Sequence, residues 1–200
     1  MNRKSRLGIL FIAIAILSIQ CKNQNTAEEV DGTTEETWKT QSNVLSYEEQ
    51  EAGWELLFDG ENADQWKGYN KEGFPEKGWK VEKGALMVLY SGTEEEGFGG
   101  DLITKESYEN FEFKVDFMLT DTANSGIFYR VVEMENTPIW HNAPEFQLLD
   151  DSTYLAMGNV TKAQLTGANY DMHEPLGNFT NPIGEWNTAR IVVDGNRVEH

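Results

Sequence analysis

The second half of the chain alternates between apolar and polar side chains with a period of two. From Phe111 to Leu119 every second residue is aromatic or aliphatic, and charged residues occupy three of the four positions between them. Successive side chains of a strand point to opposite faces, whereas a helix would distribute these aromatic side chains around its axis. The segment is therefore predicted as a strand with one buried face.

Other short apolar runs, each bounded by glycine or polar turn residues, have the same character. They predict strands at 54–58, 79–81, 85–90, 126–132, 145–149 and 190–193, and the last run leads into the hairpin signal Asp194-Gly195-Asn196. Only 152–165 is ambiguous and has room for a helical turn. Many short strands with almost no helix predict an all-β sandwich or barrel. The chain stops at His200, within the strand expected at 197–200 after this turn, so we expect the sequence to be a fragment.

The N-terminus has the pattern of a secretory signal. Residues 1–6 carry three basic side chains, and residues 7–19 are almost entirely apolar but too few for a membrane-spanning helix. The only cysteine, Cys21, follows this run, and a bacterial lipoprotein signal ends at a cysteine that becomes the lipidated N-terminus. We expect segment 1–21 to direct export and Cys21 to anchor the protein to a membrane of the cell envelope. An ordinary cleaved signal is the alternative.

Composition divides the remaining chain into two parts. Residues 22–51 are rich in Asn, Gln, Thr, Ser and Glu, so they cannot bury enough apolar surface to offset the entropy of ordering and are predicted as a flexible tether. Residues 52–200 contain nearly all the aromatic side chains and suffice for one domain with its own core. The formal net charge of −18 repels phosphate backbones, which excludes nucleic acid as an expected partner.

Candidate chemistry lies in polar residues within the predicted strands. The chain has no Gly-x-Ser-x-Gly elbow, no glycine-rich phosphate loop and no His-Glu-x-x-His helix. Arg130 would share a strand face with Gly126 and Phe128, next to Asn124 at the start of the run. An arginine among aromatic neighbours is costly to bury alone, so we expect it to meet a carboxylate or a ligand. Pairing with a glutamate of a neighbouring strand is the structural alternative.

Two further clusters carry titratable groups. Glu145 and Gln147 share one face of a predicted strand, and a carboxylate beside an amide on a concave sheet suits sugar hydroxyls or a metal ion. A solvated convex face is the alternative for the same pair. His141 precedes this strand, and His173 lies between acidic residues in a polar loop, where it is a candidate base or metal ligand or simply a solvated side chain.

Five blocks in order across residues 53–200 resemble the 3-keto-disaccharide hydrolase family. The blocks are GWELLFDG at 53–60 followed by Trp66, NSGIFYR at 124–130, EFQLLD at 145–150, TGANY at 166–170 and GEWN at 184–187. The resemblance implies a concanavalin A-like jelly roll, in which two antiparallel sheets bind ligand on the concave face. It also implies an exported or lipid-anchored bacterial protein whose family pattern continues beyond His200.

The resemblance further implies a hydrolase acting on the glycosidic bond of an oxidised, 3-keto carbohydrate. A 3-keto group acidifies the C2 proton, so a base removes it, the C1 substituent leaves and water adds. We expect Glu145 or His173 to move the proton, and Arg130 or a divalent metal ion to stabilise the enolate. The side chains expected to position the sugar are Gln147, Asn124, Tyr170 and His141.

Two other functions are compatible with the same sequence. A non-catalytic carbohydrate-binding jelly roll would use exposed tryptophans, with Trp66 and Trp140 as the candidates for stacking on sugar rings. A structural or adhesion domain displayed on the tether is the third interpretation. An assay with a keto sugar and its unoxidised parent separates the three.

Overall fold

The computed structural model describes the backbone of residues 7–13, 43–89 and 99–200, and the side chains of the last two ranges. Its strands are β1 (Leu7–Ala13), β2 (Trp54–Leu56), β3 (Trp66–Gly68), β4 (Trp79–Glu82), β5 (Ala85–Val88), β6 (Leu102–Thr104), β7 (Phe111–Met118), β8 (Asn124–Phe128), β9 (Glu145–Leu149), β10 (Trp186–Asp194) and β11 (Arg197–Glu199). The helices are α2 (Tyr47–Glu51) and α3 (Asp151–Met157), with 3₁₀ turns η1 (Ile139–His141) and η2 (Lys162–Gln164).

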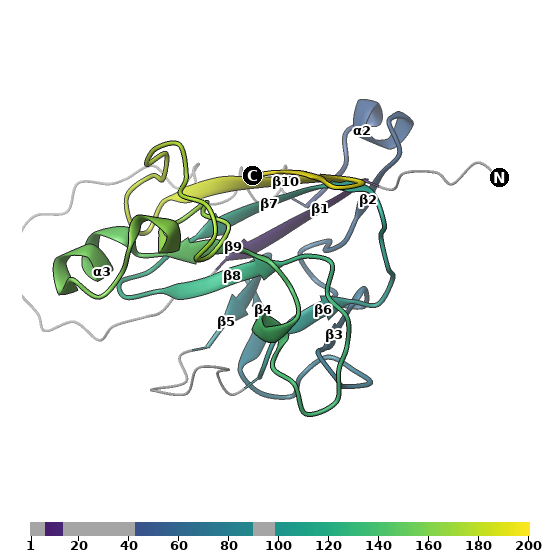
Figure 1. The fold of residues 1–200 in the computed structure, drawn as a ribbon. Coiled ribbons are helices and arrows are strands. Elements are labelled where there is room, and N and C mark those ends of the chain that lie inside the picture. The colour runs from purple at the N-terminus through teal and green to yellow at the C-terminus, as the bar shows by residue number, and fades with distance from the viewer. Residues whose placement is uncertain (1–6, 14–42, 90–98) are drawn as a thin grey trace, which may run out of the picture.

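The strands form one large sheet and two strand pairs. The large sheet has the order β11-β10-β7-β1-β5-β4, with β2 paired to β1, and the smaller units are β3–β6 and β8–β9. Every pairing that does not involve β1 is antiparallel. In Figure 1 the β8–β9 pair lies across from the layer that contains β7 and β10. This two-layer arrangement confirms the predicted all-β sandwich.

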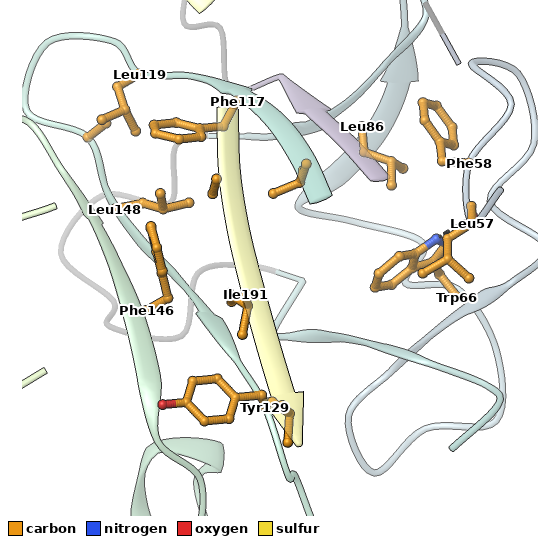
Figure 2. Close-up of a cluster of buried hydrophobic side chains, with 14 residues drawn as sticks. Leu57, Phe58, Trp66, Leu86, Phe117, Leu119, Tyr129, Phe146, Leu148 and Ile191 are labelled. Carbon is orange, nitrogen blue, oxygen red and sulfur yellow. Dashed lines mark hydrogen bonds between the residues drawn. The ribbon is translucent and has the colours of Figure 1, made fainter. Parts of the chain in front are cut away.

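The hydrophobic core lies between these layers (Figure 2). Phe117 of β7 and Ile191 of β10 are buried in one cluster with Phe146 and Leu148 of β9. Alternate residues of β7 and β10 face this cluster, as the period of two predicts. The buried face of the strand predicted between Phe111 and Leu119 is therefore confirmed.

Each predicted strand overlaps an observed one, but several bounds differ and the sequence does not predict β3 or β6. The strand predicted at 54–58 ends at Leu56, and the one predicted at 190–193 is part of the longer β10. The run predicted at 126–132 is a strand only at Asn124–Phe128. The next residue, Tyr129, is buried in the core. Arg130 then has a φ of +57°, which is incompatible with an extended strand. Sequence alternation does not report this backbone turn. The ambiguous segment 152–165 contains η2 and all but the first residue of α3, so its helical turn is confirmed.

The ordered domain begins earlier than the predicted boundary at residue 52. Asn43 is buried, and its side-chain amide donates to the Gly84 carbonyl across 2.9 Å. Helix α2 then starts with a capping box, in which Ser46 and Glu49 each bond the other's backbone N–H. The predicted tether, 22–51, therefore extends too far, because Asn43 makes a tertiary contact and residues 47–51 are helical. Its earlier part lies outside the described residues.

Strand β1 falls inside the predicted signal segment. Its backbone pairs in parallel with β7, β5 and β2, and in the order of the sheet it connects β7 to β5. The same residues cannot both pair with β7 in a mature protein and be removed with a signal, so the signal stays a prediction. Cys21 lies outside the described residues. Within the described ranges, no helix has the length and apolarity needed to cross a membrane.

Candidate active site

The outer face of the β8–β9 pair carries the polar residues of the two strongest sequence blocks. Because Phe146 and Leu148 point into the core, Glu145 and Gln147 of the same strand point away from it. The antiparallel register places Gly126 opposite Gln147, so the outer faces of both strands coincide. The structure therefore places Glu145 and Gln147 together on the face opposite Phe146 and Leu148, where Gln147 is buried and Glu145 is half-buried.

A third segment extends this surface beside β9. The backbone N–H of Tyr170 donates to the Glu145 carbonyl across 3.0 Å. The Gly167 N–H donates to the Gln147 carbonyl across 2.9 Å, and the Gln147 N–H donates to the Ala168 carbonyl across 3.1 Å. Phe146 forms a bridge with Asn169, so Tyr170 lies next to Glu145 on the outer face. The TGANY block at 166–170 thus lies along β9 and brings the Tyr170 phenol beside the carboxylate.

The Glu145 carboxylate is the most strongly perturbed group on this surface. It is half-buried, and no described residue donates a hydrogen bond to its oxygens. Burial, together with the negative charge of Asp101, raises the pKa of Glu145 to about 7. A carboxyl group with this pKa exchanges protons readily at neutral pH, which is the property of a general base or acid.

Asp101, which precedes β6, is a residue of this site that sequence reasoning missed. It is half-buried, and its carbonyl accepts the Tyr69 N–H across 2.8 Å. The charge of Asp101 acts on Glu145 although the two residues are 44 positions apart in the chain. Asp101 follows two glycines and has no alternating neighbours that would mark it in the sequence. Only the tertiary structure brings the two acids together.

Tyr170 and the pair formed by Gln147 and Asn124 provide hydrogen-bonding groups. Gln164 donates to the Tyr170 hydroxyl across 3.1 Å, and no described residue accepts the hydroxyl's own hydrogen. Burial and the charges of Asp171 and Glu145 raise the pKa of Tyr170, so the phenol stays protonated. The Gln147 amide is buried and donates to the Asn124 side-chain oxygen across 3.3 Å. Asn124 itself is exposed.

Arg130 and Trp66 lie elsewhere than the sequence predicts. The exposed Arg130 donates from its guanidinium to the Gly195 carbonyl in the turn between β10 and β11. The prediction that it continues the strand face of Gly126 is wrong, because β8 ends at Phe128. Trp66 is only 6% exposed, and its indole N–H donates to the Leu57 carbonyl across 2.8 Å, so it is a core residue and not an exposed sugar platform.

The two candidate histidines occupy exposed turns. His141 ends η1, where its ring lies edge-on to that of Trp140 with centroids 6.0 Å apart. His173 follows Tyr170, and its Nδ1 lies 3.5 Å from the Asn169 side-chain nitrogen. Neither histidine is among the groups that shift the pKa of Glu145. Because Glu145 is half-buried and His173 is exposed, the carboxylate is the better-placed of these two candidate bases.

A metal centre made by side chains alone usually has three or more ligands, whereas Mg²⁺ can be held by one or two carboxylates and water. Among residues 43–89 and 99–200, no group of three His, Cys, Asp or Glu side chains is arranged to hold one. The Glu145 and Asp101 carboxylates alone would supply two oxygen-bearing groups. The described residues therefore do not provide a complete protein-ligated metal centre.

Comparisons with known proteins identify relatives of residues 53–200 and of most of the chain. The family described as "3-keto-alpha-glucoside-1,2-lyase-like domain" matches residues 53–200. A Bacteroides thetaiotaomicron protein named 3-keto-disaccharide hydrolase is 34% identical over 161 residues, which cover 74% of this chain and 55% of that protein. The chain thus spans little more than half the length of this relative.

A solved structure supports the same relationship. A Parabacteroides distasonis protein described as a "putative glycosyl hydrolase" shares 33% sequence identity with a TM-score of 0.67. The match covers 78% of this chain and 71% of that protein. At this identity, the similarity extends beyond the bare fold to the sequence.

Proposed function

The chain belongs to the 3-keto-alpha-glucoside-1,2-lyase-like family, and on this premise we propose that it hydrolyses the glycosidic bond of a 3-keto-disaccharide. The proposal takes its substrate class from the family description and from the name of the Bacteroides thetaiotaomicron relative. The observation that carries it in this molecule is the half-buried Glu145 carboxylate with a pKa of about 7. An ordinary carboxylate would be a much weaker base for removing a proton from carbon.

The proposed chemistry is an elimination followed by addition of water. The C3 carbonyl acidifies the C2 proton, and the ionised Glu145 removes it to give an enolate and a protonated Glu145. The enolate then expels the C1 oxygen of the leaving sugar, which takes up a proton, and a C1–C2 double bond forms. Water adds its oxygen to C1, C2 regains a proton, and the net result is hydrolysis.

The neighbouring groups fit contacts to sugar oxygens. Tyr170 has a free hydroxyl hydrogen beside Glu145, so we assign it a hydrogen bond to an oxygen of the keto sugar. The exposed Asn124 amide, held by Gln147, is assigned to a sugar hydroxyl on the same face. The Tyr170 hydroxyl and the Asn124 amide both donate and accept hydrogen bonds, which suits the hydroxyl groups of a neutral sugar. An anionic substrate would be repelled by Glu145 and Asp101.

The decisive experiment compares an oxidised and an unoxidised substrate. The purified protein is incubated with a 3-keto-disaccharide and with its unoxidised parent, each with and without a chelator, and the released monosaccharides are quantified. Release from the keto form alone is the expected result. Retention of either sugar without release would support the carbohydrate-binding alternative, and cleavage of both sugars equally would contradict the elimination mechanism. Loss of activity with chelator would add a metal ion to the reaction.

Arg130→Ala tests whether this arginine stabilises the enolate. We expect kcat/KM on the keto substrate to stay within about threefold of the unmodified protein, because the exposed guanidinium binds the Gly195 carbonyl and not the Glu145 surface. Steady-state kinetics provide the measurement. A loss of about 100-fold or more would instead restore the role that the sequence suggested for Arg130.

We also propose that the protein is exported and lipid-anchored through Cys21. The support is the sequence alone: basic residues, an apolar run and then the single cysteine. Feeding cells an alkyne-tagged fatty acid should label the protein but not a Cys21→Ser variant. The mass of the mature N-terminus would also decide whether residues 7–13 are retained, since cleavage before Cys21 removes them.

A further inference from the structure

Gly126, at the middle of β8, lies beneath the Glu145 side chain. A Cβ atom built on Gly126 would be 1.8 Å from the Glu145 Oε1 atom, 2.5 Å from Cδ and 2.6 Å from Cγ. These distances are far below van der Waals contact, and they involve the entire end of the side chain. The carboxylate therefore lies directly on the bare backbone of the neighbouring strand.

The need for glycine at this position comes from space and not from backbone conformation. Gly126 is within a regular antiparallel pair and does not have the positive φ of Gly167 or Gly195. An alanine could adopt its backbone geometry without strain, and glycine in a strand interior is otherwise unfavourable. Close approach of another group is the remaining physical reason for glycine here.

We propose that Gly126 is a positioning residue, which holds the Glu145 carboxylate half-buried against β8 because it lacks a Cβ atom. Any larger side chain would lift the carboxylate away from the sheet and into solvent. This inference rests on the proposed role of Glu145 as the base. It assigns to the glycine of the NSGIFYR block the task of setting where that base lies and how strongly it is desolvated.

Gly126→Ala tests the inference without requiring activity. We expect the Glu145 pKa, followed by its side-chain carboxyl ¹³C shift, to fall from about 7 toward the ordinary 4.5 because the displaced group regains water. On the keto substrate, kcat/KM should drop by about 100-fold, and the acidic limb of its pH profile should move in the same direction. An unchanged carboxyl titration in a folded Gly126→Ala protein would overturn the proposal.

Matched variants separate this effect from general damage to a strand. Gly68→Ala also introduces a Cβ into a strand, where it would meet the flexible Lys71 Cδ at 2.7 Å, and it should leave the Glu145 titration unchanged. If Gly126→Ala does not fold, adding Glu145→Ala should restore folding, because the obstructing side chain is gone. Failure of this double variant to fold would overturn the proposal.

A failure of the positioning role of Gly126 is distinguishable from a failure of the proposed hydrolase function. If the unmodified protein does not cleave 3-keto-disaccharides, the hydrolase proposal fails, but the ¹³C titration still reports whether Gly126 controls Glu145. If the protein is active and the titration does not change in Gly126→Ala, the positioning role alone is lost.

Discussion

Replacing Glu145 with glutamine should reduce kcat/KM on a 3-keto-disaccharide by about 100- to 10,000-fold, the range that a general base contributes. The amide is nearly isosteric with the carboxyl group and cannot accept the C2 proton. KM should change little, because Tyr170 and Asn124 still face the substrate. A normal rate in Glu145→Gln would exclude this residue as the base.

The same substitution should make the folded state more stable in neutral and alkaline solution. Because burial and the charge of Asp101 raise the Glu145 pKa to about 7, the folded state holds a proton that the unfolded state releases near 4.5. Stability is therefore lost as the pH rises between these values. Urea unfolding should show the variant more stable than the unmodified protein by about 1–3 kcal/mol at about pH 8, and nearly equal to it at about pH 4.

An exposed glutamate provides the matched control for both measurements. Glu61 follows the GWELLFDG block at 53–60 and is exposed. Glu61→Gln therefore removes one carboxylate charge from a solvated position. It should retain the activity and the pH dependence of the unmodified protein. If Glu61→Gln also stabilised the fold at high pH, net charge and not the environment of Glu145 would be responsible.

Asp150→Ala should lower the free energy of unfolding by about 3 kcal/mol without a direct effect on the reacting groups. Asp150 is only 1% exposed and follows β9. Its carboxylate accepts bonds from the Thr122 N–H at 3.0 Å, the Ser152 hydroxyl at 2.8 Å and the Thr153 N–H at 3.2 Å. Alanine leaves these donors without their acceptor and removes the N-cap of α3.

The Asp150 contribution has a defined pH dependence. Burial acts to raise the Asp150 pKa, but the hydrogen bonds from Thr153, Thr122 and Ser152 outweigh it and hold the pKa at about 2, below the usual 3.8. A depressed pKa stabilises the fold above 3.8, and this stabilisation is lost as the pH falls toward 2. Denaturant titration of Asp150→Ala should therefore show a deficit that shrinks in acid.

Two controls limit the interpretation of that result. Asp150→Asn keeps one acceptor oxygen without the charge, so it should be intermediate in stability and lack the acid-dependent loss. Asp64→Ala truncates an exposed aspartate and should have an effect of less than about 0.5 kcal/mol. A fully stable Asp150→Ala protein would show that water replaces the lost acceptor.

The strands could be predicted because their signal is local. Between Phe111 and Leu119, and again between Glu145 and Leu149, the pattern of side chains alone identifies an extended segment and its buried face. The pattern leaves one question open, since it does not say which face of β9 packs against the hydrophobic core cluster. Packing of Phe146 and Leu148 into the core answers it and directs Glu145 outward.

The remaining site residues depend on backbone geometry and tertiary contacts. Arg130 continues an apparent strand in the sequence, but its positive φ redirects the chain and its side chain reaches Gly195. Trp66 is indistinguishable in sequence from an exposed aromatic, although three-residue β3 places it in the core. Asp101 becomes relevant only because folding brings its charge near Glu145.

The segment 166–170, which pairs with β9, affects the thermodynamics of substrate recognition. Its backbone bonds to Glu145 and Gln147 fix Tyr170 as part of the sheet, and the entropy cost of ordering it is met during folding. If a binding loop became ordered only when the ligand bound, the entropy cost of ordering it would reduce the affinity for the ligand. Here the phenol and the carboxylate are already neighbours in the free protein. Contacts to the sugar therefore contribute to affinity and catalysis without the entropy cost of ordering this segment.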